Sequence, residues 1–516
     1  MKSSSRLQTS IAASVLALAV ITPAAVTAPA TSNLSVHAAP KKSAADYNGL
    51  PSGSTKKKTL VIGLDGAALS QINESNTPNL SALADGGMVS SSNLYASPMA
   101  PTVSGAGWSS IATGVWPDKH QAVDNNFTNP NYEQYPDYLT RIENQKPQNS
   151  TMVIGTWGPI PDIIFKQGAD LKLSGGNDAG TTAKAVDYLK NGNPDSTFIH
   201  LDEIDGAGHN SGSDSTAYTK AHATADAQVG QILQAVHERE SFAKEDWLVI
   251  VTADHGHTPN GGHGGSSPRE RATFVIANGK KFPAGNERKD VKITDIAPTV
   301  LDHQSVDIDS RWSLDGLPIN SIQPDDFDAL RSELKSAVDE TKLGTALKGW
   351  TTNIPAGWSI DNSKMPTGGV AEWSGWSFST DEFWSNTDNN QGRETSVHNR
   401  NVFAVADSDE WDDKSHAAGQ FDSTLISPKY KVNGAKKAVL TFASNYKIDG
   451  PQSAQVLVSF DGTAPVLARS YTQDFNGVEN IELEIPEKAK RAQLSFHYTG
   501  TNSAFWTIDQ VTLTAK

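Results

Sequence analysis

Acidic and imidazole side chains, the types that hold divalent metal ions, recur through the first half of this chain, most of them just after a hydrophobic run. The runs read TLVIGL, STFIHL and WLVIVTA. A short continuous apolar run bounded by polar and glycine-rich residues suits a buried parallel strand. Ligands of open α/β sheets collect beyond the carboxyl ends of the strands, so these side chains are expected to form a catalytic metal pair. The six residues are Asp65, Asp205, His209, Asp254, His255 and His263.

A serine in front of a helix-like segment is the predicted nucleophile. The segment 101–117 reads PTVSGAGWSSIATGVWP, and Ser104 stands where a loop enters the helix, followed by small residues that let a ligand approach the backbone. Its hydroxyl would face the partial positive charge of a helix amino terminus. Serine in this place is more often a helix cap. The metal-binding residues, together with the lack of any cysteine, favour a nucleophile instead.

Composition sets outer bounds on fold and partners. A chain of 516 residues is expected to hold about two to three domains. Its formal net charge of -15 disfavours binding to nucleic-acid duplexes or anionic membranes. Because the chain has no cysteine, disulfides and thiolate metal ligands are excluded.

The amino terminus has the pattern of a secretory leader. Lys2 and Arg6 precede an apolar stretch from Ile11 to Ile21, and small residues then lead to a cleavage site after Ala38 or Ala39. We expect residues 1–39 to be a signal peptide and the protein to be secreted. The apolar stretch is too short to span a bilayer, and no second long apolar run follows it.

The rest of the chain divides by composition. Residues 40–58 are rich in serine, lysine and glycine and predict a flexible linker. Over 59–322, strand-like runs alternate with helical patterns such as 216–240, which predicts an α/β domain with a mainly parallel sheet flanked by helices. An amphipathic pattern predicts a linker helix within 323–349. Residues 350–516 alternate with period two and predict an all-β sandwich or jelly roll.

Five separated motifs resemble those of the alkaline phosphatase superfamily, most closely its nucleotide pyrophosphatase/phosphodiesterase branch and bacterial relatives. They are LDG at Asp65, the segment from Ser104 ending in ATGVWP, Asp205 with Gly208-His209, Asp254-His255-Gly256, and His263. The resemblance covers about 59–322 and implies an alkaline-phosphatase-like fold.

The resemblance also implies roles for these residues. Asp205, His209 and His263 would hold one metal ion. Asp65, Asp254, His255 and the Ser104 oxygen would hold the other. Asn125, in the string VDNNF, falls where that branch places an asparagine that donates to a phosphate oxygen.

Three features separate this chain from the branch or its relatives. The branch usually carries threonine at the nucleophile, whereas Ser104 is the residue type of monoesterases. His263 follows His255 by only eight residues, a spacing more like that of cofactor-independent phosphomutases. Ser104 is followed by Gly-Ala-Gly and so lacks the C/S-x-P-x-R context of sulfatases.

The predicted function is a secreted two-metal phosphoesterase that cleaves phosphodiester or nucleotide pyrophosphate bonds of small molecules through a phosphoserine. Mixed imidazole and carboxylate ligands suit Zn²⁺, and the same set also accommodates Mn²⁺. No arginine adjoins Ser104 in sequence, which favours diesters over dianionic monoesters, although Arg141 or Arg269 could fold into place. The alternatives are a phosphomonoesterase and a non-catalytic protein that binds the cell envelope.

Several neighbouring residues have more ordinary interpretations. His257 and Asp202 are expected to support ligands rather than bind metal. His120 and His303 are expected to be surface or packing histidines. Aromatic side chains near the site are expected either to pack in the core or to form a leaving-group pocket. These aromatic residues are Trp108, Trp116, Tyr132, Tyr135 and Tyr138.

The carboxy-terminal region shows no catalytic cluster and resembles jelly-roll modules of the MAM or cleaved-adhesin type. Its tryptophans, including Trp411 and those in the segment 373–384, either fill the sandwich or stack on sugars of a cell-wall polymer. A run of acids is either a solvated loop or a structural Ca²⁺ site. These acids are Asp407, Asp409, Asp412 and Asp413.

Overall fold

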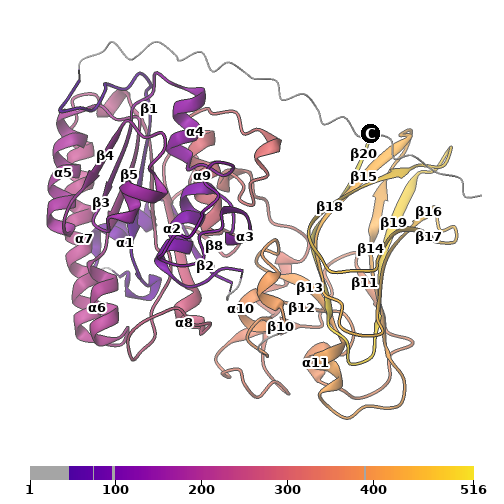
Figure 1. Cartoon of the computed structure of the whole chain (residues 1–516). Helices are drawn as coiled ribbons and strands as arrows, with labels where there is room; N and C mark the ends of the chain where they lie inside the picture. The colour runs from indigo at the N-terminus through magenta and orange to yellow at the C-terminus, as the bar shows by residue number, and fades with distance from the viewer. Residues whose placement is uncertain (1–45, 74, 96–98, 389–390) are drawn as a thin grey trace, which may run out of the picture. The chain divides into compact units, whose positions relative to one another are not determined.

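A computed structural model describes residues 46–73, 75–95, 99–388 and 391–516 (Figure 1). The predicted signal peptide, 1–39, lies outside the described residues. No helix within the described ranges is both long enough and apolar enough to cross a membrane.

The first part of the chain is built on an eight-stranded sheet with strand order β4-β3-β5-β1-β6-β7-β2-β8. β1 pairs in parallel with β5 and β6, and β3 pairs in parallel with β4 and β5. β7 is antiparallel to both of its neighbours. The expected fold class, a mainly parallel sheet flanked by helices, is confirmed. The strands are β1 Lys57–Leu64, β2 Met88–Asn93, β3 Thr151–Gly155, β4 Leu171–Ser174, β5 Ser196–Leu201, β6 Asp246–Thr252, β7 Ala272–Asn278 and β8 Asn286–Arg288.

Helices cover both faces of this sheet because its central strands are apolar on both sides. In β1, Val61 joins a core with α2, α4 and α9, whereas Leu60 and Ile62 join a second core with α1, α5 and α7. Figure 1 shows α5 and α7 side by side along one flank. The helices are α1 Pro78–Asp85, α2 Ser104–Thr113, α3 Pro117–His120, α4 Tyr138–Gln145, α5 Asp178–Asn191, α6 Glu203–Ser211, α7 Thr216–His237, α8 Pro268–Arg271 and α9 Ile296–His303.

The helix predicted over 216–240 is confirmed as α7. It begins after Ser215, whose hydroxyl accepts a hydrogen bond from the Tyr218 amide as an N-cap. The histidines expected to pack rather than to catalyse are buried, with His120 at 0% and His303 at 9% exposure.

The linker predicted at 40–58 is not a free tether where the structure describes it. Leu50 is buried, and its amide and that of Tyr47 bond to each other's carbonyls. The Gly53 amide donates to Asn193 O, and Ser54 N donates to Asp195 Oδ2. A single buried leucine and these hydrogen bonds hold a polar segment that composition alone marks as flexible.

The prediction of a linker helix within 323–349 is wrong. A short 3-10 helix at Asp328–Glu333 is followed by β9, Lys335–Ser336, which pairs with β10, Lys348–Thr351. The amides of Asp339 and Glu340 donate to one carboxylate oxygen of Glu372. Burial of Phe327, Leu330 and Leu334 together with these tertiary bonds overrides the helical propensity of the segment.

The all-β region has two antiparallel sheets. The seven-stranded sheet has the order β18-β15-β20-β13-β12-β10-β9, and the five-stranded sheet has the order β11-β14-β19-β16-β17. Phe442 of β15 meets Phe496 of β19 at 5.4 Å between ring centroids, so the sheets pack through alternating apolar positions. The remaining strands are β11 Ser359–Asp361, β12 Ser377–Ser379, β13 Phe403–Asp407, β14 Phe421–Lys431, β15 Lys437–Tyr446, β16 Ser453–Phe460, β17 Val466–Tyr471, β18 Phe475–Glu484, β19 Arg491–Gly500 and β20 Phe505–Ala515. Two short helices are α10 Asp381–Trp384 and α11 Ser408–Asp412.

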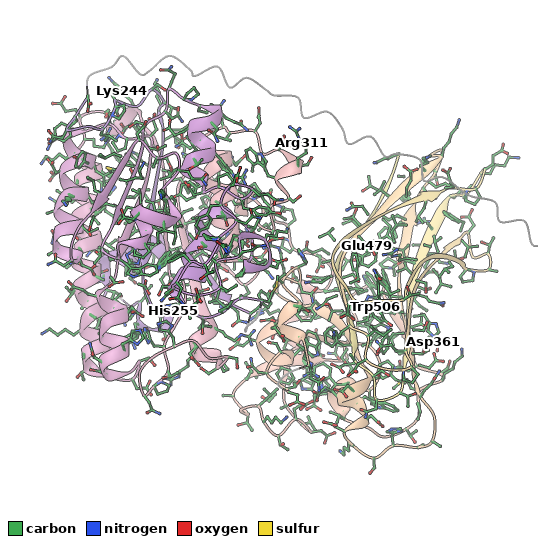
Figure 2. All side chains as sticks on the ribbon, in the orientation of Figure 1. Lys244, His255, Arg311, Asp361, Glu479 and Trp506 are labelled. Carbon is green, nitrogen blue, oxygen red and sulfur yellow. The ribbon has the colours of Figure 1, made fainter. Side chains whose placement is uncertain are left out.

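The tryptophans of this region fill its core. Figure 2 labels Trp506 among the side chains of this region. All seven tryptophans from residue 350 onward are at most 7% exposed, so they pack in the core rather than lie on the surface. They are Trp350, Trp358, Trp373, Trp376, Trp384, Trp411 and Trp506.

Two of the four acids considered for a structural Ca²⁺ have partners within the chain. Asp407 accepts from Trp384 Nε1 at 2.9 Å and pairs with the buried Arg393, while Asp412 pairs with His416. Among the described residues, every group of three or more acids and imidazoles spaced for a metal lies in the α/β domain.

Candidate metal centre

The expected ligands meet at the carboxyl edge of the eight-stranded sheet. Gly63 of β1 is in register with His200 of β5 and with Thr252 of β6, so the residues that follow these three strands emerge together. Asp65 follows β1 and Asp254 follows β6, while Asp205 lies on α6, directly after β5.

Two buried carboxylates and one imidazole form the first group. Asp65 Oδ1 and Asp254 Oδ2 are buried and have no hydrogen-bond partner. His255 Nε2 lies 3.5 Å from the first of these oxygens and 3.3 Å from the second. Buried polar atoms are normally hydrogen-bonded, so two unpaired oxygens facing one imidazole nitrogen form the donor set of a cation.

The pKa values of the two carboxyls in this group shift in opposite directions because their charges interact with each other and with the nearby imidazoles. Burial, and next the charge of Asp65, raise the pKa of Asp254 well above its usual value. Burial acts in the same direction on Asp65, but the hydrogen bond from His200 and the charges of His255 and His200 outweigh it and lower the pKa of Asp65. Two ionised carboxylates in this space require a positive charge between them.

Asp65 is held by two donors on the side away from the unpaired oxygen. Its Oδ2 accepts from Trp108 Nε1 at 2.9 Å and pairs with His200 Nε2 at 3.0 Å. The Trp108 and His200 rings meet edge to face, 5.0 Å apart. A Cβ on Gly63 would come within 2.3 Å of Trp108, so glycine is needed there for the indole to reach Asp65. Trp108 is thus both a core residue, as expected, and a support for a metal ligand.

His200 was missed in the sequence. It lies near the carboxyl end of the buried run STFIHL, and an imidazole in such a strand, two positions before the acid at 202, is the signal that marks it. Its Nδ1 faces the Trp157 amide at 3.5 Å, which leaves the proton on Nε2 for donation to Asp65.

The second group surrounds Asp205. Asp205 and His209 lie four residues apart on α6, and His209 Nε2 is 3.4 Å from Asp205 Oδ2. His263 Nε2 lies 3.0 Å from His209 Nε2 and 3.4 Å from Asp205 Oδ1. Positive φ angles at Gly261 and Gly262 turn the loop back toward the sheet edge. His263, only eight residues after His255, therefore reaches Asp205 and His209.

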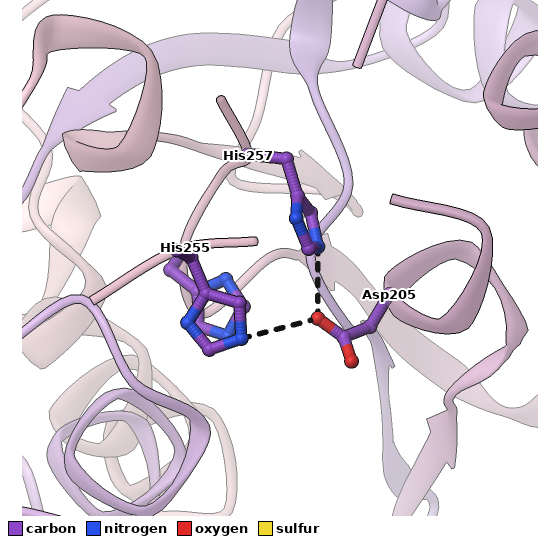
Figure 3. A group of neighbouring side chains, drawn as sticks. Asp205, His255 and His257 are labelled. Atoms are coloured by element: carbon purple, nitrogen blue, oxygen red, sulfur yellow. Dashed lines mark hydrogen bonds and ion pairs between the residues drawn. The ribbon is translucent and has the colours of Figure 1, made fainter. Parts of the chain in front are cut away.

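His257 and Asp202, which were expected only to support the ligands, lie close enough to the site to bind a cation themselves. His257 Nε2 is 2.8 Å from Asp205 Oδ1, and Figure 3 shows this ring and that of His255 around the Asp205 carboxylate. One carboxylate oxygen of Asp202 lies within 4.8 Å of ligand atoms of Asp65 and His200. Burial, and next the charge of Asp65, raise the pKa of Asp202 to about 6.

Ser104 is not a helix cap. Val103 occupies the N-cap position of α2, and no side chain caps the helix. The Ser104 hydroxyl, 7% exposed as a residue, instead lies 3.2 Å from His255 Nε2. Ser104 is therefore the first residue of a ten-residue helix, with its oxygen beside the first group and near the positive end of the helix dipole.

The small residues after Ser104 serve packing within the chain. A Cβ on Gly105 would lie 2.3 Å from Asp124 O, and one on Gly107 would lie 2.7 Å from Asp254 O. The close approach of 124–125 lets Asn125 Oδ1 accept from the Gly105 amide at 2.7 Å. The Nδ2 group of this exposed asparagine is then the half of the amide turned away from the helix.

The other side chains considered for the site are engaged elsewhere. Arg141 stacks on Trp312 at 4.2 Å and donates to Pro136 O, and Arg269 pairs with Asp214. Among the described contacts, neither guanidinium reaches Ser104 or the six acids and imidazoles. The remaining aromatic residues considered for the site are at most 8% exposed, so they pack in the core; they are Trp116, Tyr132, Tyr135 and Tyr138.

Comparison with known proteins assigns the family. The sequence matches the family of type I phosphodiesterases / nucleotide pyrophosphatases over residues 59–175 and 169–398. The chain belongs to this family. Its α/β domain has the mainly parallel sheet flanked by helices that the sequence predicted.

Individual relatives are distant and longer. Ectonucleotide pyrophosphatase/phosphodiesterase family member 3 of Rattus norvegicus is 24% identical over 232 residues, 40% of this chain and 25% of the relative. GPI ethanolamine phosphate transferase 1 of Candida glabrata is 30% identical over 155 residues, 30% of this chain and 15% of the relative. The aligned part thus spans a quarter or less of these curated relatives.

Solved structures with a similar fold include two at TM-scores of 0.40. Inactive murine ectonucleotide pyrophosphatase/phosphodiesterase 5 in complex with AMP is 14% identical and covers 49% of this chain and 96% of its own. A protein of the alkaline phosphatase superfamily from Vibrio parahaemolyticus is 15% identical and covers 55% of this chain and 76% of its own.

The support of Asp65 by Trp108 can be tested without emptying the core. Trp108→Phe keeps an aromatic ring against β1 but removes the donor to Asp65 Oδ2. We expect zinc affinity, measured by competition with a chelator, to fall about 10- to 100-fold, as for other residues that orient metal ligands. Trp116→Phe, an equally buried indole packed on Tyr95, should leave the affinity unchanged. Equal affinities in the two variants would contradict the role of Trp108.

Proposed function

We propose that this chain is a metal-dependent phosphodiesterase or nucleotide pyrophosphatase that acts through Ser104. The observation that carries the proposal is the Ser104 hydroxyl, 3.2 Å from His255 Nε2, beside two buried and unpaired carboxylate oxygens. Family membership supports hydrolysis of phosphoesters as the reaction class.

The donor sets fit two divalent cations. Asp65, Asp254, His255 and the Ser104 oxygen would hold one, and Asp205, His209 and His263 would hold the other. Imidazole and carboxylate donors without thiolates suit zinc, and manganese accepts the same ligands. When bound, such a pair supplies charge neutralisation on the phosphate and activates hydroxyl groups and water.

The residues themselves supply position and the nucleophile. Ser104 Oγ gives its proton to water and forms a bond to phosphorus, while the P–O bond opposite breaks and the leaving alkoxide of a diester takes a proton from water. Water then attacks the phosphoserine, which frees Ser104 and releases a phosphomonoester. The amino terminus of α2 favours the negative charge that develops on the serine oxygen.

Diesters and pyrophosphates fit the site better than monoesters. Asn125 offers one neutral donor through Nδ2, which suits the single charge of a diester. A dianionic monoester is usually matched by an arginine fork, and Arg141 and Arg269 are engaged with other partners. The monoesterase remains the second candidate because Ser104 is the residue type of that class.

Removal of the nucleophile tests the proposal directly. Ser104→Ala should abolish turnover of an aryl phosphodiester while both zinc ions stay bound, because only one ligand oxygen is lost. Ser110→Ala, on the same helix but bonded to Ala106 O and His120, should retain turnover. Initial rates and zinc content of both variants are the measurements, and turnover by the Ser104→Ala protein would rule out the nucleophile.

Asn125 tests the substrate preference. Asn125→Ala should lower kcat/KM for an aryl diester by about 10²- to 10³-fold, as expected for loss of one donor to the transition state. Asn126→Ala removes the neighbouring exposed amide, which bonds to Asp124, and should leave kcat/KM unchanged. If wild-type kcat/KM for an aryl monoester exceeds that for the diester, the monoesterase assignment replaces ours.

We also propose that the protein is exported, on the leader pattern of its first 39 residues. Sequencing of the amino terminus of protein recovered from the culture medium should begin at Ala39 or Pro40. An intact Met1 in the cell fraction alone would contradict export.

The β region is proposed as a jelly-roll module from its two antiparallel sheets, but its buried tryptophans supply no surface for a glycan. A purely envelope-binding role is disfavoured, since a silent scaffold would not need paired, unpartnered carboxylates.

A further inference from the structure

We propose that His257 is a fourth protein ligand of the second cation, alongside Asp205, His209 and His263. The proposal rests on the metal site of the proposed function. It goes beyond the ligand set that the family resemblance implies, which stops at three.

The His257 ring is held in one orientation by glycines from two different elements. A Cβ on Gly66, just after β1, would lie 2.6 Å from His257 Nε2, and a Cβ on Gly208, in α6, would lie 2.5 Å from Cδ2. The side chain is fully buried, and Tyr218, which donates to Gly66 O, closes the space beyond it. Two residues without side chains thus leave a slot for this imidazole, which points at Asp205 (Figure 3).

The hydrogen-bond partners of His257 indicate that Nε2 carries a lone pair. Nδ1 lies 3.3 Å from the carbonyl of Gly262, which can only accept, so the tautomer with its hydrogen on Nδ1 donates there and leaves a lone pair on Nε2. Nε2 lies 2.8 Å from Asp205 Oδ1. In that tautomer both atoms can bind one cation, whereas the other tautomer would donate to Asp205.

His263 repeats the pattern. Its Nδ1 donates to Thr102 O at 2.7 Å, which leaves a lone pair on Nε2, and this atom lies 3.0 Å from His209 Nε2. Nε2 atoms of two imidazoles, His257 and His263, therefore converge on the same oxygen of Asp205.

The spacing fits ligands of one ion. Adjacent donors around a tetrahedral zinc with bonds of about 2.0 to 2.1 Å lie roughly 3.3 Å apart. The distances from Asp205 Oδ1 to His257 Nε2 and to His263 Nε2 are 2.8 and 3.4 Å. The His209 side chain is 49% exposed, whereas His257 and His263 are 0% and 7% exposed. His257 would therefore bind the ion from its buried side, and His209 would bind it from the side open to solvent.

Two replacements of His257 that have nearly the same shape as each other distinguish a metal ligand from a residue that only donates a hydrogen bond to Asp205. His257→Asp can bind a cation but cannot donate to Asp205, whereas His257→Asn can donate and is the weaker ligand. We expect the Asp variant to bind the second zinc at least about tenfold more tightly than the Asn variant, in chelator competition on the full chain. Equal affinities or the reverse order would overturn the proposal.

His222→Asn is the matched control. His222 is buried beside Tyr218, but its nitrogens face Ala68 N and Tyr218 O rather than a carboxylate. Its zinc affinity should equal that of the wild type. A loss as large as that of His257→Asn would show that any buried histidine here affects metal binding through folding, which would overturn the assignment.

A measurement on the wild type does not depend on a variant that folds. X-ray absorption of the protein with two zinc ions should give about two imidazoles per zinc if His257 binds, and about one and a half if it does not. Since neither readout uses turnover, the ligand count stands even if Ser104 proves not to be the nucleophile. Failure to bind a second zinc would overturn both the proposed function and this inference.

Discussion

The constraint on which the site depends is the burial of two carboxylates, Asp65 and Asp254, close together and away from water. Asp65 and Asp254 are buried side by side, each with one oxygen that has no hydrogen-bond partner. Such a pair is costly unless a positive charge lies between the oxygens. No arginine or lysine supplies it among the described contacts of these oxygens, and the nearest charge-bearing partner is the imidazole of His255. In the proposed function a bound cation would supply this charge, and folding of this edge would then be linked to metal binding.

The sheet provides the rigidity that this arrangement needs. β1 lies at the centre between β5 and β6, and their in-register ends fix the positions of three acids with little freedom. Glycines then let supporting groups come close: Gly63 admits Trp108 to Asp65, while Gly66 and Gly208 admit His257 to Asp205. A Cβ at any of these places would lie within 2.6 Å of the neighbouring ring, so the ring would have to move. The glycines near the site are therefore part of its geometry, although they do no chemistry.

The sequence predicted the sheet, its flanking helices and the six acids and imidazoles that the structure brings together, because strand periodicity and position after a strand are local signals. It did not predict how closely His257 and His200 approach the carboxylates. A histidine inside an apolar strand, or two residues from better ligands, has the same local pattern whether it packs or supports a metal, and only the fold decides which carboxylate it meets. The prediction of a linker helix over 323–349 failed for a related reason. The segment instead forms a short 3-10 helix, a strand that pairs with β10, and a following loop whose amides donate to Glu372. Local propensity was outweighed by tertiary contacts that no window of sequence contains.

Charge balance connects the ligand set to the substrate. The proposed ligand sets include the carboxylates of Asp65, Asp205 and Asp254, alongside imidazoles and one hydroxyl. Two dications against three carboxylates would leave a net charge of about +1 in the resting site. That net charge would match the single negative charge of a phosphodiester or of the phosphate group attacked in a pyrophosphate substrate. The second charge of a monoester would need a further cation, yet Arg141 is stacked on Trp312 and Arg269 is paired with Asp214. With this charge balance, the proposed role of Asn125, to orient one phosphate oxygen, would need no further charge at that position.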